Sequence, residues 1–485
     1  MKYQSQKIAL AYFLVAMALF AVQVTMGLVL GWIYVDGNFL SEVLPFNVAR
    51  MLHTNSLIVW LLLGFFGAAY YLIPEETERE IHSSKLAYLQ LAIFVLGTAG
   101  VVVTYFFNLF EGNFLLGREG REFLEQPRWV KAGIVVAALI FLYNVSMTVL
   151  AGKKTAITNI LLLGLWGLAL LFLFAFVNPS NLALDKMYWW YVVHLWVEGT
   201  WELVMASILA FLMLKLTGVD REVVEKWLYV IAALALFSGI LGTGHHYYYI
   251  GTPSYWLCIG GIFSALEPLA FLGMAAYAIV MMRKGGREHP NKSALAWTIG
   301  CAIMAFVGAG FLGIAHTIPQ VNIWTHGTLV TAMHGHMAFW GAYAMLVLAI
   351  MSYALPHLTG RSLHQSRLAV VAFWCANIGM IAMTLAFAVA GVAQVYLERK
   401  MGLDFMDVQR EIAVHFVGLV LAAALFTLGI VAFIVHFVAH GRPVGEVQSP
   451  AEAELSAPPT APTPETQENA PPADAGPAGA APASA

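Results

Sequence analysis

Runs of about twenty apolar residues recur along this chain, and they constrain its fold more than any other feature. A helix of about that length is needed to cross the hydrocarbon core of a bilayer. Of the 485 residues, 60% are hydrophobic and 11% are charged, whereas soluble domains carry roughly a quarter charged residues. We therefore predict an all-α polytopic membrane protein whose partner is the lipid bilayer and not a nucleic acid.

The apolar runs number twelve, and each predicts one transmembrane helix. They lie near residues 8–32, 51–74, 86–107, 129–151, 158–177, 187–216, 223–248, 255–282, 292–316, 322–354, 366–396 and 411–438. The first run is too long for the core of a signal peptide and lacks a clear cleavage site. We therefore expect it to remain as a helix.

The charge distribution predicts the orientation of the chain. With twelve helices both termini lie on one side, and most of the 25 lysine and arginine residues fall in segments on that side. Basic residues collect in the cytoplasm, so we expect both termini there. Residues 446–485 are rich in alanine, proline and glutamate and cannot bury enough apolar surface to fold. We predict a twelve-helix transmembrane domain over residues 1–445 and a disordered cytoplasmic tail over 446–485.

The segment HLWVE (194–198) places an imidazole and a carboxylate four residues apart within one predicted span. On a helix this spacing puts His194 and Glu198 on one face, within reach of one metal ion. His245 and His246 close another predicted span and raise the imidazole ligands to three. The hard carboxylate oxygen favours iron over copper. The alternative for Glu198 is a protonated core acid held by hydrogen bonds.

Two further histidines, His334 and His336, lie two residues apart in the tenth predicted span. On a helix they point about 200° apart, so they cannot share one metal ion but can serve two haems on opposite sides. One haem could take His53 as its second axial ligand, and the other would keep an open face for substrate. The alternative is a set of unrelated core histidines.

Six motifs carry a resemblance to a known family. They are MLHTN (51–55), EGREFLEQP (119–127), HLWVEGTWE (194–202), GTGHHYYYIG (242–251), FSALEP (263–268) and HGTLVTAMHGHMAFWG (326–341). Together they resemble the haem–copper oxidase superfamily and, within it, the catalytic large subunits of cytochrome c-dependent nitric oxide reductases. The resemblance covers nearly the whole chain apart from the tail, and it implies a twelve-helix, haem–copper oxidase-like bundle.

The resemblance implies a role for each of these ligands. His53 and His336 would be the axial ligands of a low-spin haem b, and His334 the axial ligand of a high-spin haem b3. The non-haem iron would be held by His194, Glu198, His245 and His246. Oxygen-reducing relatives carry a tyrosine where this chain has Glu198. That difference favours NO reduction over the rival interpretation, a terminal oxygen reductase of the same superfamily.

The implied reaction is 2 NO + 2 e⁻ + 2 H⁺ → N₂O + H₂O, a step of denitrification in the bacterial cytoplasmic (inner) membrane. Two metals facing each other suit this reaction because two NO molecules must be held together while the N–N bond forms. The resemblance marks Glu202 and Glu267 as catalytic carboxylates near the site.

The loop between the third and fourth spans carries the remaining implied site residues. Glu122 and Glu125 would take up protons from the periplasmic side, and Glu122 would also lie near a Ca²⁺ ion that bridges haem propionates. His326 is a candidate for contact with a propionate. The neighbouring Glu111 and Glu119 are interpreted as solvated loop residues.

Electrons would come from a separate, membrane-anchored cytochrome c subunit, because the chain has no CxxCH site for covalent haem attachment. The missing N-terminal extension of quinol-dependent relatives also favours the cytochrome c-linked type. A rival of a different class is a secondary transporter. It would need inverted repeats and broken helices, and it would leave the histidines unexplained.

Overall fold

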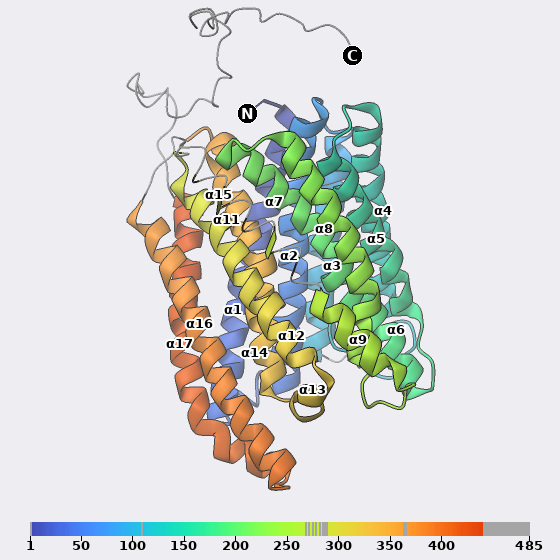
Figure 1. Ribbon diagram of the computed structural model, residues 1–485, viewed down its shortest axis with the longest axis vertical. Coiled ribbons are helices and arrows are strands. Elements are labelled where there is room, and N and C mark those ends of the chain that lie inside the picture. Colours follow the sequence, from blue (N-terminus) through green and yellow to red (C-terminus); the bar gives the residue numbers. More distant parts are fainter. Residues whose placement is uncertain are drawn as a thin grey trace, which may run out of the picture.

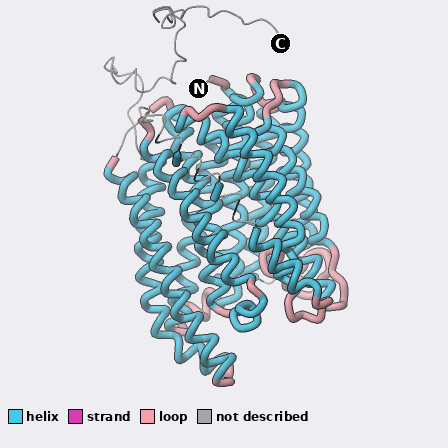
Figure 2. Tube along the Cα trace, in the orientation of Figure 1, coloured by secondary structure: helices cyan, strands magenta, loops and turns pink. Residues whose placement is uncertain are grey.

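The computed structural model describes residues 2–439, except residues 108–109, scattered positions between 267 and 289, and residues 362–365. The described chain is a bundle of long helices that run side by side along its longest axis (Figure 1). Figure 2 shows the loops gathered at the two ends of the bundle. A bilayer demands this arrangement, because lipid offers no hydrogen-bond partner to an exposed loop backbone.

The helices have the following bounds in chain order. They are α1 (Lys7–Val35), α2 (Phe46–Thr77), α3 (Ser84–Phe107), α4 (Arg128–Ala151), α5 (Ala156–Phe172), α6 (Leu182–Leu195), α7 (Trp201–Thr217), α8 (Arg221–Gly242), α9 (Tyr255–Leu266), α11 (Lys292–Ala305), α12 (Leu312–Thr317), α13 (Pro319–Thr325), α14 (Leu329–Ala338), α15 (Met345–Thr359), α16 (Arg367–Gln394) and α17 (Phe405–Ala439). Short 3₁₀ turns lie at Gln4–Gln6, Leu173–Phe176 and Thr243–Tyr247.

Eleven stretches in the described part of the chain are long and apolar enough to cross a membrane. The predicted span at 255–282 is the one that differs. Its described beginning is α9, a helix of 12 residues, and many of its later positions lie outside the described residues. The prediction of an all-helical, polytopic membrane protein is confirmed, and the count of twelve is close.

Several membrane-crossing stretches contain a π-helical turn. These turns are Trp196–Thr200 between α6 and α7, Phe306–Phe311 between α11 and α12, Phe339–Ala344 between α14 and α15, and Val395–Lys400 after α16. A π turn inserts one extra residue into a helix and often occurs at functional sites. The first of them contains Glu198.

Burial separates central from peripheral helices. The apolar windows of α2, of Leu182–Thr217 and of Leu329–Thr359 are 78%, 83% and 89% buried, against 28% for the first helix and 22% for α3. The three central stretches carry His53, His194 and the pair His334 and His336. These four candidate ligands therefore lie in the stretches most shielded from lipid, whereas His245 and His246 close the stretch Arg221–Tyr247, whose apolar window is 50% buried.

The first described helix, α1, begins at the same face of the bundle at which the last, α17, ends. Gln6 Nε2 donates to the carbonyl of Tyr71 over 3.0 Å, and Tyr71 Oη lies 2.8 Å from His357 Nδ1. Arg361, shortly after α15, donates to the carbonyl of Val438 over 3.2 Å. We call this end the N-terminal face. The predicted tail, residues 446–485, lies outside the described residues.

Candidate metal centre

Three histidine side chains converge in the interior of the bundle. His194 lies in the last turn of α6, while His245 and His246 lie on the 3₁₀ turn Thr243–Tyr247 that follows α8. His245 Nε2 lies 2.9 Å from His246 Nε2, which lies 3.1 Å from His194 Nδ1. One ligand atom from each residue falls within 4.8 Å of the others. The turn after α8 thus lets two adjacent histidines point toward the same place.

The opposite nitrogens of two of these rings are held by the protein. His194 Nε2 lies 2.9 Å from the carbonyl of Gly239, to which it donates, and His245 Nδ1 lies 2.7 Å from Ser264 Oγ on α9. Such partners are typical of metal-ligating histidines, because they fix the tautomer and orient the ring. Ring nitrogens this close need a proton or a cation between them, so the donor set fits a divalent metal ion.

Glu198 adds a carboxylate to this cluster. Its Oε2 lies 3.5 Å from His194 Nδ1. Glu198 sits inside the π turn with φ −101° and ψ 26°, so its backbone departs from the regular helix that the four-residue spacing predicts. The two side chains meet on one face nonetheless. Three imidazoles and one carboxylate form a set that suits iron.

A cavity of about 180 Å³ lies beside this cluster. Glu198, Glu202 and His334 line it, and apolar and aromatic side chains make up most of the remaining wall. Glu202 is buried near the start of α7. Glu267 lies outside the described residues, so its predicted role stays a prediction. The cavity suits a small, uncharged substrate between the metal cluster and His334.

The three histidines predicted as haem ligands share one feature. In each, Nδ1 lies near a backbone carbonyl, that of Gln23 for His53 (2.8 Å), of Gly308 for His334 (3.0 Å) and of Ala332 for His336 (2.8 Å). A ring that donates its Nδ1 proton to a carbonyl presents the lone pair of Nε2 as a ligand.

The geometry of His53 and His336 fits one axial pair. Their ring centroids lie 6.2 Å apart with 26° between the ring planes. Two nitrogens on opposite sides of one metal ion, each about 2 Å from it, bring the ring centroids to about 6 Å. The two residues therefore fit the axial positions of one haem, as the resemblance implies. His334 lines the cavity instead.

The predicted proton-uptake residues lie in the loop between α3 and α4. Glu125 is buried and accepts a hydrogen bond of 2.9 Å from Asn55 Nδ2. Burial raises the pKa of the Glu125 carboxyl, and the Asn55 hydrogen bond offsets part of that rise. Glu122 is partly exposed and forms an ion pair with Arg50. In the described part of the chain no group of three metal-binding side chains forms around Glu122. His326 is exposed between α13 and α14.

Four residues of this centre escaped the sequence analysis. Trp190, four residues before His194, stacks on His246 with the ring centroids 3.6 Å apart and 8° between the planes. Ser264 lies within the FSALEP motif, but its bond to His245 spans 19 positions of the sequence. Gly239 and Gly308 contribute their carbonyls, a group that every residue type carries. The spacing of Trp190 was the one local signal that could have pointed to its role.

Comparison with known proteins gives consistent results. The family model for cytochrome c and quinol oxidase polypeptide I matches residues 7–425. The chain is 50% identical over 467 residues to a nitric oxide reductase subunit of Stutzerimonas stutzeri, covering 93% of this chain and 98% of that protein. It is 23% identical over 385 residues to a cytochrome c oxidase subunit 1 homologue of Agrobacterium tumefaciens (strain T37), covering 73% and 68%. A haem–copper terminal oxidase solved by cryo-EM as a dimer has the same fold, with a TM-score of 0.73 at 16% identity over 93% of this chain and 86% of that chain.

Proposed function

The chain belongs to the cytochrome c and quinol oxidase polypeptide I family, and we propose that it reduces two molecules of NO to N₂O and water. The observation that carries this proposal is Glu198, a carboxylate 3.5 Å from His194 Nδ1 in the three-histidine cluster. The 50% identity to a nitric oxide reductase subunit of another bacterium supports it.

We propose that His194, His245, His246 and Glu198 hold a non-haem iron, that His334 binds a haem b3, and that His53 and His336 bind a low-spin haem b. The metals would supply electrons to NO and stabilise the negative charge that develops on its oxygen. The chain supplies the cavity beside the histidine cluster, which brings two NO molecules together and thereby reduces the entropic cost of forming an N–N bond. Its mostly apolar walls exclude bulk water.

Protons must cross the protein to reach this cavity, and carboxylates are suited to carry them. Glu202 is buried and lines the cavity. Glu125, held by Asn55 at the loop between α3 and α4, has a raised pKa and can therefore hold a proton nearer neutral pH than an exposed glutamate. We propose a route that begins at Glu122 and Glu125 and ends at Glu202 and Glu267, with protons taken from the periplasmic side.

The proposed setting of the protein follows from the same reasoning. We propose that it spans the bacterial inner membrane with both termini in the cytoplasm and receives electrons from a membrane-anchored cytochrome c subunit. The three cysteines are Cys258, Cys301 and Cys375, and none lies in a CxxCH sequence. We therefore propose that the covalently attached haem of the electron donor is carried by that subunit. Ca²⁺ near Glu122 and a propionate contact of His326 remain parts of this proposal.

Glu198→Gln tests the proposal directly, because glutamine keeps the size of the side chain and removes its charge. Losing a residue that only orients a metal ligand typically lowers activity by roughly 10–100-fold. Because Glu198 is proposed to bind the metal itself, we expect NO turnover to fall by more than that. The iron-to-haem ratio should fall while the haem b absorption is retained. The control is Glu222→Gln, an exposed carboxylate at the start of α8. Full NO turnover of Glu198→Gln with an unchanged iron-to-haem ratio would contradict the proposal. If the unmodified protein turned over O₂ but not NO, the rival function, a terminal oxygen reductase, would be favoured.

Glu125→Gln tests proton uptake through its pH dependence. Because the pKa of Glu125 is raised, the carboxyl stays protonated above its ordinary range and loses the proton as the pH rises through the raised pKa. NO turnover of the unmodified enzyme should decline over that rise. Glutamine cannot release a proton, so the variant should turn over roughly a hundredfold more slowly and lose that decline. Glu42→Gln, in the exposed loop between α1 and α2, is the control. An unchanged pH profile would rule out this role.

A further inference from the structure

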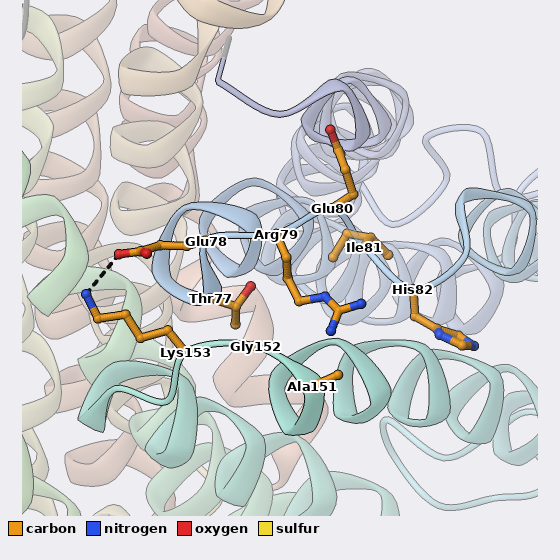
Figure 3. Close-up of a pocket in the computed structure, with 9 residues that line it drawn as sticks. All are labelled: Thr77, Glu78, Arg79, Glu80, Ile81, His82, Ala151, Gly152 and Lys153. Carbon is orange, nitrogen blue, oxygen red and sulfur yellow. Dashed lines mark hydrogen bonds and ion pairs between the residues drawn. The ribbon is translucent and has the colours of Figure 1, made fainter.

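A second pocket, of about 500 Å³, opens at the N-terminal face, and none of its lining residues lines the cavity beside the metal centre. It lies between the segment that joins α2 to α3 and the segment that joins α4 to α5 (Figure 3). Arg79 and His82 contribute from the first segment, and Gly152 and Lys153 from the second. None of these residues takes part in the proposed reaction.

The guanidinium of Arg79 lies in this pocket without a protein partner in the described part of the chain. Its Nε is buried and makes no hydrogen bond. The two neighbouring carboxylates are engaged elsewhere, as Figure 3 shows: Glu78 pairs with Lys153 over 2.9 Å, and Glu80 points away from Arg79. Glu80 accepts hydrogen bonds from Ser5 Oγ (2.5 Å) and from the Ser5 backbone N–H (2.8 Å). A donor shielded from water with no acceptor costs free energy, and an anion from outside the chain would supply the acceptor that Arg79 Nε lacks.

The walls of the pocket are fixed by the backbone. Lys153 N–H donates to the carbonyl of Thr77 over 3.0 Å, and His82 N–H donates to Thr148 Oγ1 over 2.9 Å. A Cβ at Gly152 would lie 2.9 Å from Arg79 Cδ and 2.7 Å from Thr77 Cβ. The absence of a side chain at Gly152 therefore keeps room for the Arg79 side chain in its present position.

We propose that this pocket binds a phosphate group through Arg79, with His82 and Lys153 at its rim. A planar guanidinium binds phosphate through two parallel hydrogen bonds, which a lysine cannot do. A volume of about 500 Å³ lies in the range of small-ligand sites. The adjoining helices α3 and α4 are peripheral, with 22% and 39% of their apolar windows buried. The phosphate can thus belong to a membrane lipid headgroup or be free phosphate.

Binding measurements on the purified, delipidated protein distinguish these sources. Native mass spectrometry with phosphatidylglycerol, compared with a diacylglycerol of the same chains, tests the lipid. Calorimetric titration with inorganic phosphate tests the free anion. At least one probe should bind, and Arg79→Gln should weaken that probe roughly tenfold, because a charge-assisted hydrogen-bonded pair is lost. The proposal is overturned if neither probe binds the unmodified protein. It is also overturned if the Arg79→Gln variant binds both probes as tightly as the unmodified protein.

Two further variants separate a built site from general surface charge. Gly152→Ala keeps every charge but crowds Arg79, and it should weaken binding of the same probe. Lys154→Gln removes a positive charge from an exposed neighbour outside the pocket and should leave binding unchanged. An equal loss in Lys154→Gln and Arg79→Gln would refute a site at Arg79. In all variants the haem absorption spectrum should stay unchanged, which shows that the protein is folded independently of its NO turnover.

Discussion

Gly239 contributes to the metal centre in two ways. Its carbonyl accepts the hydrogen bond from His194 Nε2, and a Cβ at this position would overlap the carbonyl oxygen of Glu198. Gly308 plays the same part for His334, since its carbonyl faces His334 Nδ1 and a Cβ there would lie 2.5 Å from the backbone of Met337. His194 and His334 are therefore each oriented by a neighbouring backbone that can come so close only because a glycine has no side chain.

Gly239→Ala should displace the π turn that carries Glu198, because the added methyl group overlaps its carbonyl. We expect the iron-to-haem ratio and NO turnover to fall together while both haems remain visible in the absorption spectrum. Gly199→Ala is a matched control within the same turn, since a Cβ there meets no atom within 4 Å. Equal iron content in the two variants would contradict this view of Gly239.

At the scale of the element, the π turn Trp196–Thr200 decides where Glu198 points. In this turn the Trp201 N–H donates to the carbonyl of Trp196, five residues back, in place of the regular four-residue helical bond. Thr200 Oγ1 lies 3.2 Å from the carbonyl of Leu195 and 3.4 Å from that of Trp196, and it donates toward both. The Thr200 hydroxyl thus gives the carbonyls of the widened turn an additional hydrogen-bond donor. This contact stabilises a backbone that would otherwise favour the regular helix.

Thr200→Val should weaken this turn, because valine keeps the shape of the side chain and removes the donor. A buried hydrogen bond of this kind contributes about 1 kcal/mol, so we expect a lower thermal unfolding midpoint and a reduced iron-to-haem ratio. Thr427→Val is the control, since Thr427 donates to the carbonyl of Ala423 within the regular helix α17. It should lower the unfolding midpoint without loss of iron. Loss of iron in both variants would argue against a specific role for the turn.

At the scale of the whole molecule, the bundle places its most buried helices around the metal centre and its lipid-facing helices outside. Both ends of the described chain meet at the N-terminal face through the contacts of Gln6, His357 and Arg361. The loop that carries Glu122 and Glu125 lies at the opposite face. The residues proposed to take up protons and the two ends of the described chain therefore lie at opposite faces of the bundle.

Cysteine labelling tests the proposed orientation in a background without the native cysteines. Gly37→Cys lies in the loop between α1 and α2, and Lys154→Cys lies at the N-terminal face. Because basic residues collect in the cytoplasm, a membrane-impermeant maleimide should label Gly37→Cys in intact spheroplasts and Lys154→Cys only after lysis. The reverse pattern would invert the orientation and place proton uptake on the cytoplasmic side.

The sequence alone determined the class of the protein, nearly all of its spans and the group of histidines and Glu198 that the structure brings together. Apolar length and the cost of an ionisable group in lipid are properties of local sequence, so they can be seen without a structure. The predicted roles of Glu202, Glu125 and Glu267 came only from the resemblance. Glu267 itself lies outside the described residues.

Only the tertiary structure decided how these residues are held. The carbonyls of Gly239 and Gly308, the hydroxyl of Ser264 and the ring of Trp190 come from other elements or act through backbone atoms. Such contacts depend on how closely two helices approach, and that distance is set by packing between residues far apart in the sequence. The pocket around Arg79 has the same origin, since it exists only where two interhelical segments meet.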